Sequence, residues 1–180
     1  SGITMKEMLV DKLDQTIDLI KKSHTSIIGQ KIPLKENITD EQFNNAYDKI
    51  KNELGYKLFI KEIRFDCPNG VNDGKFYVTF KNIGNVDMIG NYNVSLENYT
   101  YDKFSFNLLQ ENTIKGIKSN QEITLSFNFI EDTFTLPNDT LYTNIYSLKI
   151  YKYVGTNNKK EINLCNADLE NKNELIFYIY

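Results

Sequence analysis

Several residue types are rare or missing in this chain of 180 residues, and each shortage excludes a class of site. Tryptophan is absent, and His24 is the only histidine. Only two cysteines occur, Cys67 and Cys165, and they are too far apart for a CxxC pair. A structural zinc site needs four nitrogen or sulfur ligands and is therefore excluded. The two thiols allow one disulfide or two unpaired side chains, and we expect them to be unpaired and partly buried.

A surplus of positive charge is also lacking. The chain has 21 basic and 24 acidic residues, which gives a formal net charge of -3. That balance does not favour binding to nucleic-acid phosphates or to an anionic membrane. No apolar run approaches the roughly 20 residues that cross a bilayer, and the first residues, SGITMKEM, lack the layout of a signal peptide. We therefore expect no nucleic-acid partner and no membrane insertion.

The first 55 residues have the periodicity of helices. Thr4 and Glu7 have the spacing of a capping box, and so do Thr39 and Gln42. Gly55 stands where a left-handed residue would end the second helix. The apolar positions at helical spacing are Met5, Leu9, Leu13, Ile17 and Ile20, followed by Phe43, Ala46, Tyr47, Ile50 and Leu54. The sequence thus predicts two α-helices.

From Tyr56 onward the apolar period changes to two, which is typical of strands with one buried face. A change of face between Ile60 and Ile63 indicates a bulge. The alternating apolar sets are Phe76-Val78-Phe80, Tyr92-Val94-Leu96, Phe104-Phe106-Leu108, Ile123-Leu125-Phe127-Phe129, Tyr146-Leu148-Ile150 and Leu175-Phe177-Ile179. These strands and the turns between them predict a β-sandwich over residues 56–180, preceded by a helical lead-in over residues 1–55.

Three stretches follow one another in a recognisable order: ELGYKLFIKEIRF (53–65), FYVTFKNIGNVDMIGNYNVSL (76–96) and EINLCNADLENKNELIFYIY (161–180). Together they resemble a bacterial family of glycosyl-hydrolase-like proteins of unknown function, in which a TIM-type barrel precedes a C-terminal immunoglobulin-like sandwich. The departures are Asp87-Met88, where Ala-Pro is commoner, and Cys165, where Ala is usual. The resemblance implies that the barrel with its catalytic carboxylates is absent from this chain. The first helix would be the last helix of that barrel or a relic of it.

The fold prediction combines the periodicity with this resemblance. The chain is expected to be mainly β, an antiparallel immunoglobulin-like β-sandwich of seven or eight strands preceded by two α-helices.

The stretch KKSHTSIIG places the only histidine between hydroxyl residues, an arrangement also found in active sites that use histidine as a general base. A serine-type triad also needs a nucleophile on a rigid elbow, and no GxSxG occurs in the sequence. A histidine near a helix C-terminus is better explained by capping of free carbonyls. The family resemblance adds a His-x-Ser element at the end of the barrel portion. We therefore expect His24 to affect how the helical lead-in joins the sandwich.

Other candidate sites rest on acidic residues. Glycoside hydrolysis needs two carboxylates held about 5 to 9.5 Å apart. The candidate acids scatter along polar faces and turns, and they are Glu53, Glu62, Glu97, Glu111 and Glu122. We expect them to be solvated surface groups, so no catalytic residue is assigned. The Asn- and Asp-rich connectors favour turns over calcium sites, and no metal or cofactor is predicted.

Tyrosine is the aromatic residue that is abundant here, with 12 copies. Sugar-binding sandwiches present flat aromatic side chains on which a pyranose ring packs. The candidate ligand-binding residues are Tyr92, Tyr99, Tyr101, Tyr151 and Tyr153. The alternative is that these tyrosines pack in the core or across strands.

Taken together, the residues and the resemblance predict a chain that is not an enzyme by itself. We expect a non-catalytic accessory module of a larger, glycosyl-hydrolase-like surface or secreted bacterial protein, with a structural role and weak carbohydrate binding. Its partners would be the preceding domain of the same polypeptide and a glycan, in an extracellular or cell-surface location. The alternative is a protein-binding or adhesive module that uses a strand edge or a loop surface.

Overall fold

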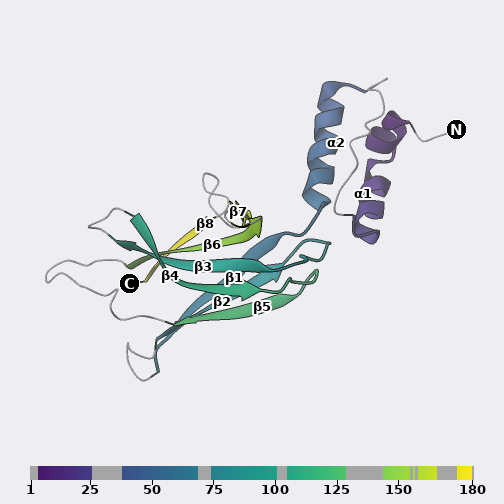
Figure 1. Cartoon of the computed structure of the whole chain (residues 1–180). Coiled ribbons are helices and arrows are strands. Elements are labelled where there is room, and N and C mark those ends of the chain that lie inside the picture. The colour runs from purple at the N-terminus through teal and green to yellow at the C-terminus, as the bar shows by residue number, and fades with distance from the viewer. Residues whose placement is uncertain are drawn as a thin grey trace.

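A computed structural model describes residues 4–25, 38–68, 74–100, 105–128, 144–154, 156, 158–165 and 174–179. Helices come first and strands follow, as Figure 1 shows. The helical elements are η1 (Glu7–Asp11), α1 (Leu13–Lys22) and α2 (Asp40–Glu53). The strands are β1 (Leu58–Asp66), β2 (Lys75–Asn82), β3 (Tyr92–Thr100), β4 (Ser105–Ile114), β5 (Glu122–Asn128), β6 (Asn144–Val154), β7 (Asn158–Glu161) and β8 (Glu174–Ile179).

The two predicted helices pack against each other with a core of their own. Their buried side chains come from the predicted apolar positions, among them Leu13 and Ile20 on α1 and Ala46 and Ile50 on α2. The capping box at the start of α2 is complete, because the Thr39 and Gln42 side chains each accept from the other residue's backbone N–H. Both helix predictions are thus confirmed.

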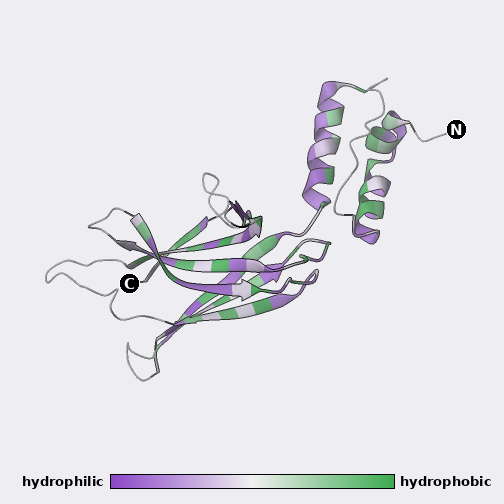
Figure 2. Cartoon of the chain, in the orientation of Figure 1, coloured by the Kyte–Doolittle hydropathy of each residue, from purple (hydrophilic) through white to green (hydrophobic). Residues whose placement is uncertain are grey.

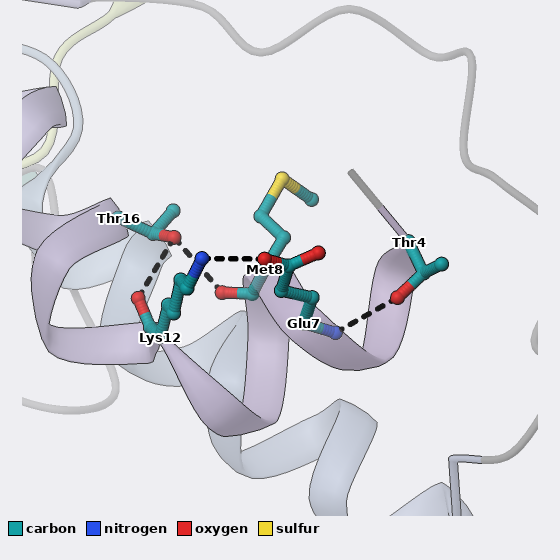
Figure 3. A network of polar contacts seen from close by, with 5 residues as sticks. All are labelled: Thr4, Glu7, Met8, Lys12 and Thr16. Atoms are coloured by element: carbon teal, nitrogen blue, oxygen red, sulfur yellow. Dashed lines mark hydrogen bonds and ion pairs between the residues drawn. The ribbon is translucent and has the colours of Figure 1, made fainter. Parts of the chain in front are cut away.

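The first helix begins with a π turn, which the sequence did not predict. The Lys12 N–H donates to the Glu7 carbonyl, five residues back, so the Met8 carbonyl loses its usual partner. The Thr16 hydroxyl donates to that carbonyl at 2.8 Å, and an ion pair joins Lys12 to Glu7 (Figure 3). Side chains four residues apart in an α-helix differ in direction by about 40°, so an apolar stripe with this spacing gradually winds around the helix. A wider π turn corrects this drift and keeps the apolar stripe on one face.

The strands form two antiparallel sheets. β1-β2-β5 make the three-stranded sheet, and β4-β3-β6-β7 with β8 make the five-stranded sheet. β7 and β8 pair with successive halves of β6, on the edge opposite β3. They therefore act as one interrupted last strand. This order of strands is that of an immunoglobulin-like sandwich, and the fold prediction is confirmed.

One hydrophobic core lies between the two sheets. Phe76, Val78 and Phe80 on β2 are at most 1% exposed, and Leu148 and Ile150 on β6 match them from the other sheet. Figure 2 shows the alternation of apolar and polar residues along these strands. The predicted alternation is confirmed for β2, β3, β5 and β6.

The prediction that Phe106 and Leu108 form the buried face of β4 was wrong. Phe106 pairs with Tyr99 and Leu108 pairs with Glu97, on the outer face of the sheet, and Leu108 is 56% exposed. The inward face of β4 is instead polar for much of its length and ends at the buried Ile114. A register shift beside Leu96 changes the pairing, so the alternation in the sequence does not reveal which face is buried.

Side chains and one backbone bridge close the two sides of the sandwich. Gln110 accepts from the Asn128 N–H at 2.7 Å, and Asn112 donates to the Ser126 carbonyl at 2.7 Å, which ties β4 to β5. On the other side, Leu58 and Leu164 form a parallel bridge. The bulge predicted near Ile60 is confirmed by a register shift between Ile60 and Glu62.

The turn after β2 lies at the end of the sandwich nearest the helices (Figure 1). The buried side chain of Asn82 accepts from Lys57 N–H at 3.1 Å and Gly84 N–H at 3.0 Å. It also donates to the Val86 and Ile117 carbonyls, at 2.8 and 3.1 Å. A Cβ on Gly84 would lie 2.6 Å from the backbone of Gly55 and Lys57. We call Asn82-Ile83-Gly84 the Asn-x-Gly corner. Its contacts fix where the helical unit leaves the sandwich.

Candidate ligand-binding face

The predicted tyrosines divide between the two faces of the five-stranded sheet. Val94 and Leu96 point into the core, so Asn93, Glu97 and Tyr99 lie on the outer face. The pairing of Asn93 with Tyr151 places the β6 residue on the same face, and Tyr153 follows two positions later. Tyr99, Tyr151 and Tyr153 are thus brought onto one surface, which we call the outer face.

A charged cluster occupies the middle of the outer face. Lys149 Nζ lies 2.9 Å from Glu97 Oε2 and 3.6 Å from Glu174 Oε1. The Ser147 hydroxyl donates to Glu174 at 2.5 Å. Burial opposes the charge of Lys149, but the two carboxylates outweigh it and raise the lysine pKa above its usual value. Three strands are therefore joined across the face by a partly buried ion-pair network.

An aromatic pair lies at one end of this cluster. The rings of Tyr99 and Phe106 are 5.3 Å apart in an edge-to-face arrangement. Lys149 Nζ is 5.9 Å from the centre of the Phe106 ring. Tyr99 is half-buried by these contacts. Its ring stabilises the β3–β4 pairing.

A second aromatic pair lies at the other end, where β6 forms a hairpin with β7. The rings of Tyr151 and Tyr153 are 5.5 Å apart. Lys159 Nζ lies 4.2 Å from the centre of the Tyr151 ring and 5.7 Å from that of Tyr153. Tyr151 is 3% exposed, whereas Tyr153 is 45% exposed. We call Tyr151, Tyr153 and Lys159 the hairpin patch.

Tyr92 lies apart from the other predicted tyrosines. Its ring is 5% exposed, and its hydroxyl donates to the Ile89 carbonyl at 3.1 Å. Tyr56 packs edge-to-face on it at 6.2 Å. Tyr92 is thus a core residue in this structure, while Tyr101 lies outside the described residues. The ligand-binding role of the five tyrosines stays a prediction.

His24 links the helical unit to the sandwich. It adopts φ +50°, and its N–H donates to Lys21 while the Thr25 N–H donates to Ile20, which is a Schellman end for α1. The imidazole Nδ1 donates to the Asn85 carbonyl at 2.5 Å. The sequence predicted that the His24 side chain caps the helix, and the structure shows that it does not. It instead makes the expected connection between lead-in and sandwich.

A polar cleft of about 260 Å³ lies beside this connection. Lys21 and Glu53 form an ion pair at 3.4 Å on its helical side. Gly84, Asn85 and Ser119 line its sandwich side. The cleft thus belongs to the junction between the two units.

The five candidate carboxylates do not assemble into a pair for hydrolysis. Glu53 lies at the helical junction, and Glu122 pairs with Lys61 and Lys81 on the three-stranded sheet. Glu111 accepts from Asn93 on the outer face, and Glu62 is exposed on β1. Glu97 was expected to be solvated, but its side chain is only 17% exposed because Lys149 pairs with it.

The two cysteines and the other potential metal ligands lie apart from one another in the described structure. Cys67 and Cys165 are free, as predicted. Cys67 is exposed rather than partly buried, and Cys165 is exposed as a residue although its sulfur is partly shielded from water. Partial burial of the Cys165 sulfur raises its pKa, and the nearby Lys57 opposes that shift. Among the described residues, no group of three or more His, Cys, Asp and Glu side chains is arranged to hold a metal ion. In the same part of the chain, no helix is long and apolar enough to span a bilayer.

Comparison with known proteins adds one solved structure. No protein-family model and no curated protein matches the chain. The chain is similar to the CARDB domain of the PF1109 protein from Pyrococcus furiosus, which was solved in complex with di-metal ions. The similarity extends over 69% of this chain and 86% of that domain, with 19% identity and a TM-score of 0.40. At this distance, function has to be argued from the residues of this chain.

The sequence did not single out Lys149, Glu174 or Lys159. Lys149 interrupts an apolar strand, which is a recognisable signal for a charge facing away from the core. Its two partners come from β3 and β8, and only the register between strands brings them together. Lys159 likewise joins the tyrosines through the β6–β7 pairing.

Proposed function

We propose that this chain is a non-catalytic accessory module that binds carbohydrate on the outer face of its five-stranded sheet. The observation that supports this best is the exposed Tyr153 ring, which is held by Tyr151 and Lys159. A ring fixed by its neighbours offers a flat apolar surface at little entropic cost. The Lys159 ammonium beside the ring is available for sugar hydroxyls.

A glycan array followed by titration calorimetry tests this proposal. We expect saturable binding that weakens about tenfold in Tyr153→Ala, because loss of one stacking ring removes on the order of 1.4 kcal/mol. Tyr47→Ala is the matched control, since Tyr47 is 56% exposed on α2, away from the outer face. Equal losses in the two variants, or an array without binding, would contradict the proposal.

A second candidate is a protein-binding module, and the exposed apolar residues of the same face favour it. Leu108 is 56% exposed and Ile176, on the edge strand β8, is 40% exposed. An exposed edge strand accepts an added strand from a partner. Leu108→Lys and Ile176→Lys would abolish capture of such a partner while leaving glycan binding intact. Glycan binding by the unchanged chain, with no protein partner captured, supports the carbohydrate proposal.

The biological setting is the last part of the proposal. We propose that the helical lead-in contacts a preceding domain of a larger extracellular or cell-surface protein of the glycosyl-hydrolase-like kind. The separate helical core and the His24 bond to the sandwich support a junction at this end. The coding sequence upstream of residue 1 tests this, and the absence of any barrel-like region there would overturn it.

A further inference from the structure

The polar cleft at the junction of the helices and the sandwich has the features of a ligand site: we propose that it binds a free α-amino acid as a zwitterion. The ends of α1 and α2 line the cleft from one side, and the turns after β2 and before β5 line it from the other (Figure 1). None of its lining residues belongs to the outer face, so this site is separate from the proposed carbohydrate surface. Its volume of about 260 Å³ lies just below the roughly 300 to 1,000 Å³ of pockets for drug-sized molecules, which suits a smaller ligand.

Charges of both signs lie on the helical side of the cleft. Lys21 Nζ and Glu53 Oε1 are 3.4 Å apart, which is longer than the roughly 2.7 to 2.9 Å of a charge-assisted hydrogen bond. Both side chains stay partly exposed, so each keeps donors or acceptors for a further partner. A zwitterion fits this loose pair, because its carboxylate would meet the Lys21 ammonium and its own ammonium would meet the Glu53 carboxylate.

Asn85 provides a second, independent observation. Both polar atoms of its side-chain amide are shielded from water and have no hydrogen-bond partner among the described residues. Its backbone carbonyl is bound by the His24 imidazole at 2.5 Å, which fixes the main chain beside the cleft. Buried amides without partners are rare, because they forgo the hydrogen bonds that water would supply. Turning into the cleft would cost this amide no hydrogen bond, and there it would donate to the ligand carboxylate and accept from the ligand ammonium.

Two more groups on the sandwich side complete the site. The Ser119 hydroxyl donates to the Gly84 carbonyl at 2.7 Å, so its oxygen is left to accept from the ligand ammonium. Ile83 also lines the cleft and is 48% exposed, which places an apolar side chain next to these polar groups. The ligand is therefore an amino acid with an aliphatic side chain, such as leucine.

The charges at and beside the cleft favour a ligand without net charge. Lys21 and Lys57 are the basic residues that line it, and Glu53 is the acidic one. Asp87 accepts from the Ser119 N–H at 2.7 Å and adds a second negative charge beside it. With two charges of each sign among the described residues, a zwitterion is matched at both of its ends, whereas an amine or a carboxylate alone is matched at one.

Calorimetry on the full chain tests the proposal with leucine and two derivatives that each lack one charge, N-acetyl-leucine and leucine methyl ester. Leucine should bind saturably, and each derivative should bind about tenfold more weakly because it loses a charge-assisted contact. Asn85→Ala should weaken leucine binding about fivefold, since the amide contacts are lost. Asn128→Ala is the matched control, because Asn128 is an exposed asparagine at the far end of β5, about 20 Å along the strand from Glu122.

A second measurement uses the helical signal at 222 nm. A ligand that contacts both units stabilises their junction, so leucine should raise the melting temperature of this signal in the unchanged chain and less in Asn85→Ala. Three outcomes overturn the inference. If leucine and its derivatives bind equally, the cleft does not recognise a zwitterion. If leucine binds equally to Asn85→Ala and to the unchanged chain, its site lies elsewhere. If leucine neither binds nor shifts the transition, the cleft is not an amino-acid site.

Discussion

At the residue scale, two asparagines of one corner make a sharp comparison. The Asn82 amide has four hydrogen bonds to backbone groups, whereas the buried amide atoms of Asn85 have none among the described residues. Asn82→Ala should lower the free energy of unfolding by about 2 to 4 kcal/mol, because buried backbone groups lose their partners. Asn85→Ala should change it by less than about 1 kcal/mol. Urea unfolding measures both, and equal costs would contradict the role assigned to Asn82.

Tyr146 gives a prediction about alkaline pH. It is fully buried, its hydroxyl has no partner in the described part of the chain, and burial raises its pKa from 10.0 to about 12. Between those values the unfolded state loses its tyrosine proton first, so stability falls as pH rises, by at most about 1.4 kcal/mol per pH unit. Tyr146→Phe should remove this part of the decline.

The phenylalanine variant also has an expected result at pH 7. Since no hydrogen bond is lost, its free energy of unfolding should be unchanged or higher by up to about 1 kcal/mol. Urea unfolding between pH 7 and pH 11 measures both effects. A variant that is much less stable at pH 7 would show that the hydroxyl has a partner after all.

At the scale of elements, His24 allows the helix end to be separated from the contact that it makes with the sandwich. His24→Gly keeps the left-handed turn and relieves its backbone, which alone should stabilise α1 by about 1 kcal/mol. The same change removes the bond from the imidazole to the Asn85 carbonyl. Hydrogen exchange should therefore slow within the last turn of α1 and become faster around Asn85. Slower exchange in both places would contradict the link.

The elements themselves were largely predictable, because periodicity is a local property of the sequence. The bulge after Ile60 was visible as a change of face, and the capping box at Thr39 was visible as spacing. Register between strands is not local, so the outward direction of Leu108 and the meeting of Lys149 with Glu174 could not be predicted. The site was predicted only in part for the same reason: the tyrosines were identified, but not the charges that surround them.

At the scale of the whole molecule, the described residues form two hydrophobic cores that share no residue. One lies within the helical unit and the other lies between the sheets. The sandwich buries the large side chains, including Phe76 and Tyr146, whereas the helical core is built from a few aliphatic residues. Two short helices with so small a core are marginally stable when isolated. The described structure therefore favours a sandwich that folds without the lead-in.

We expect a fragment of residues 56–180 to give a dispersed NMR spectrum and a cooperative thermal transition, and a fragment of residues 1–55 to be mostly unfolded. In the full chain, the helical signal at 222 nm should be lost before the β signal, because the described links between the units are few: the His24 bond, the bond from Lys57 to the Asn52 carbonyl and the corner at Gly84. Mixing the two fragments is the control, since it should not restore the helices. A sandwich fragment that binds the dye ANS and unfolds without cooperativity would contradict the boundary at residue 56, and it would show that the helices and sheets fold as one unit.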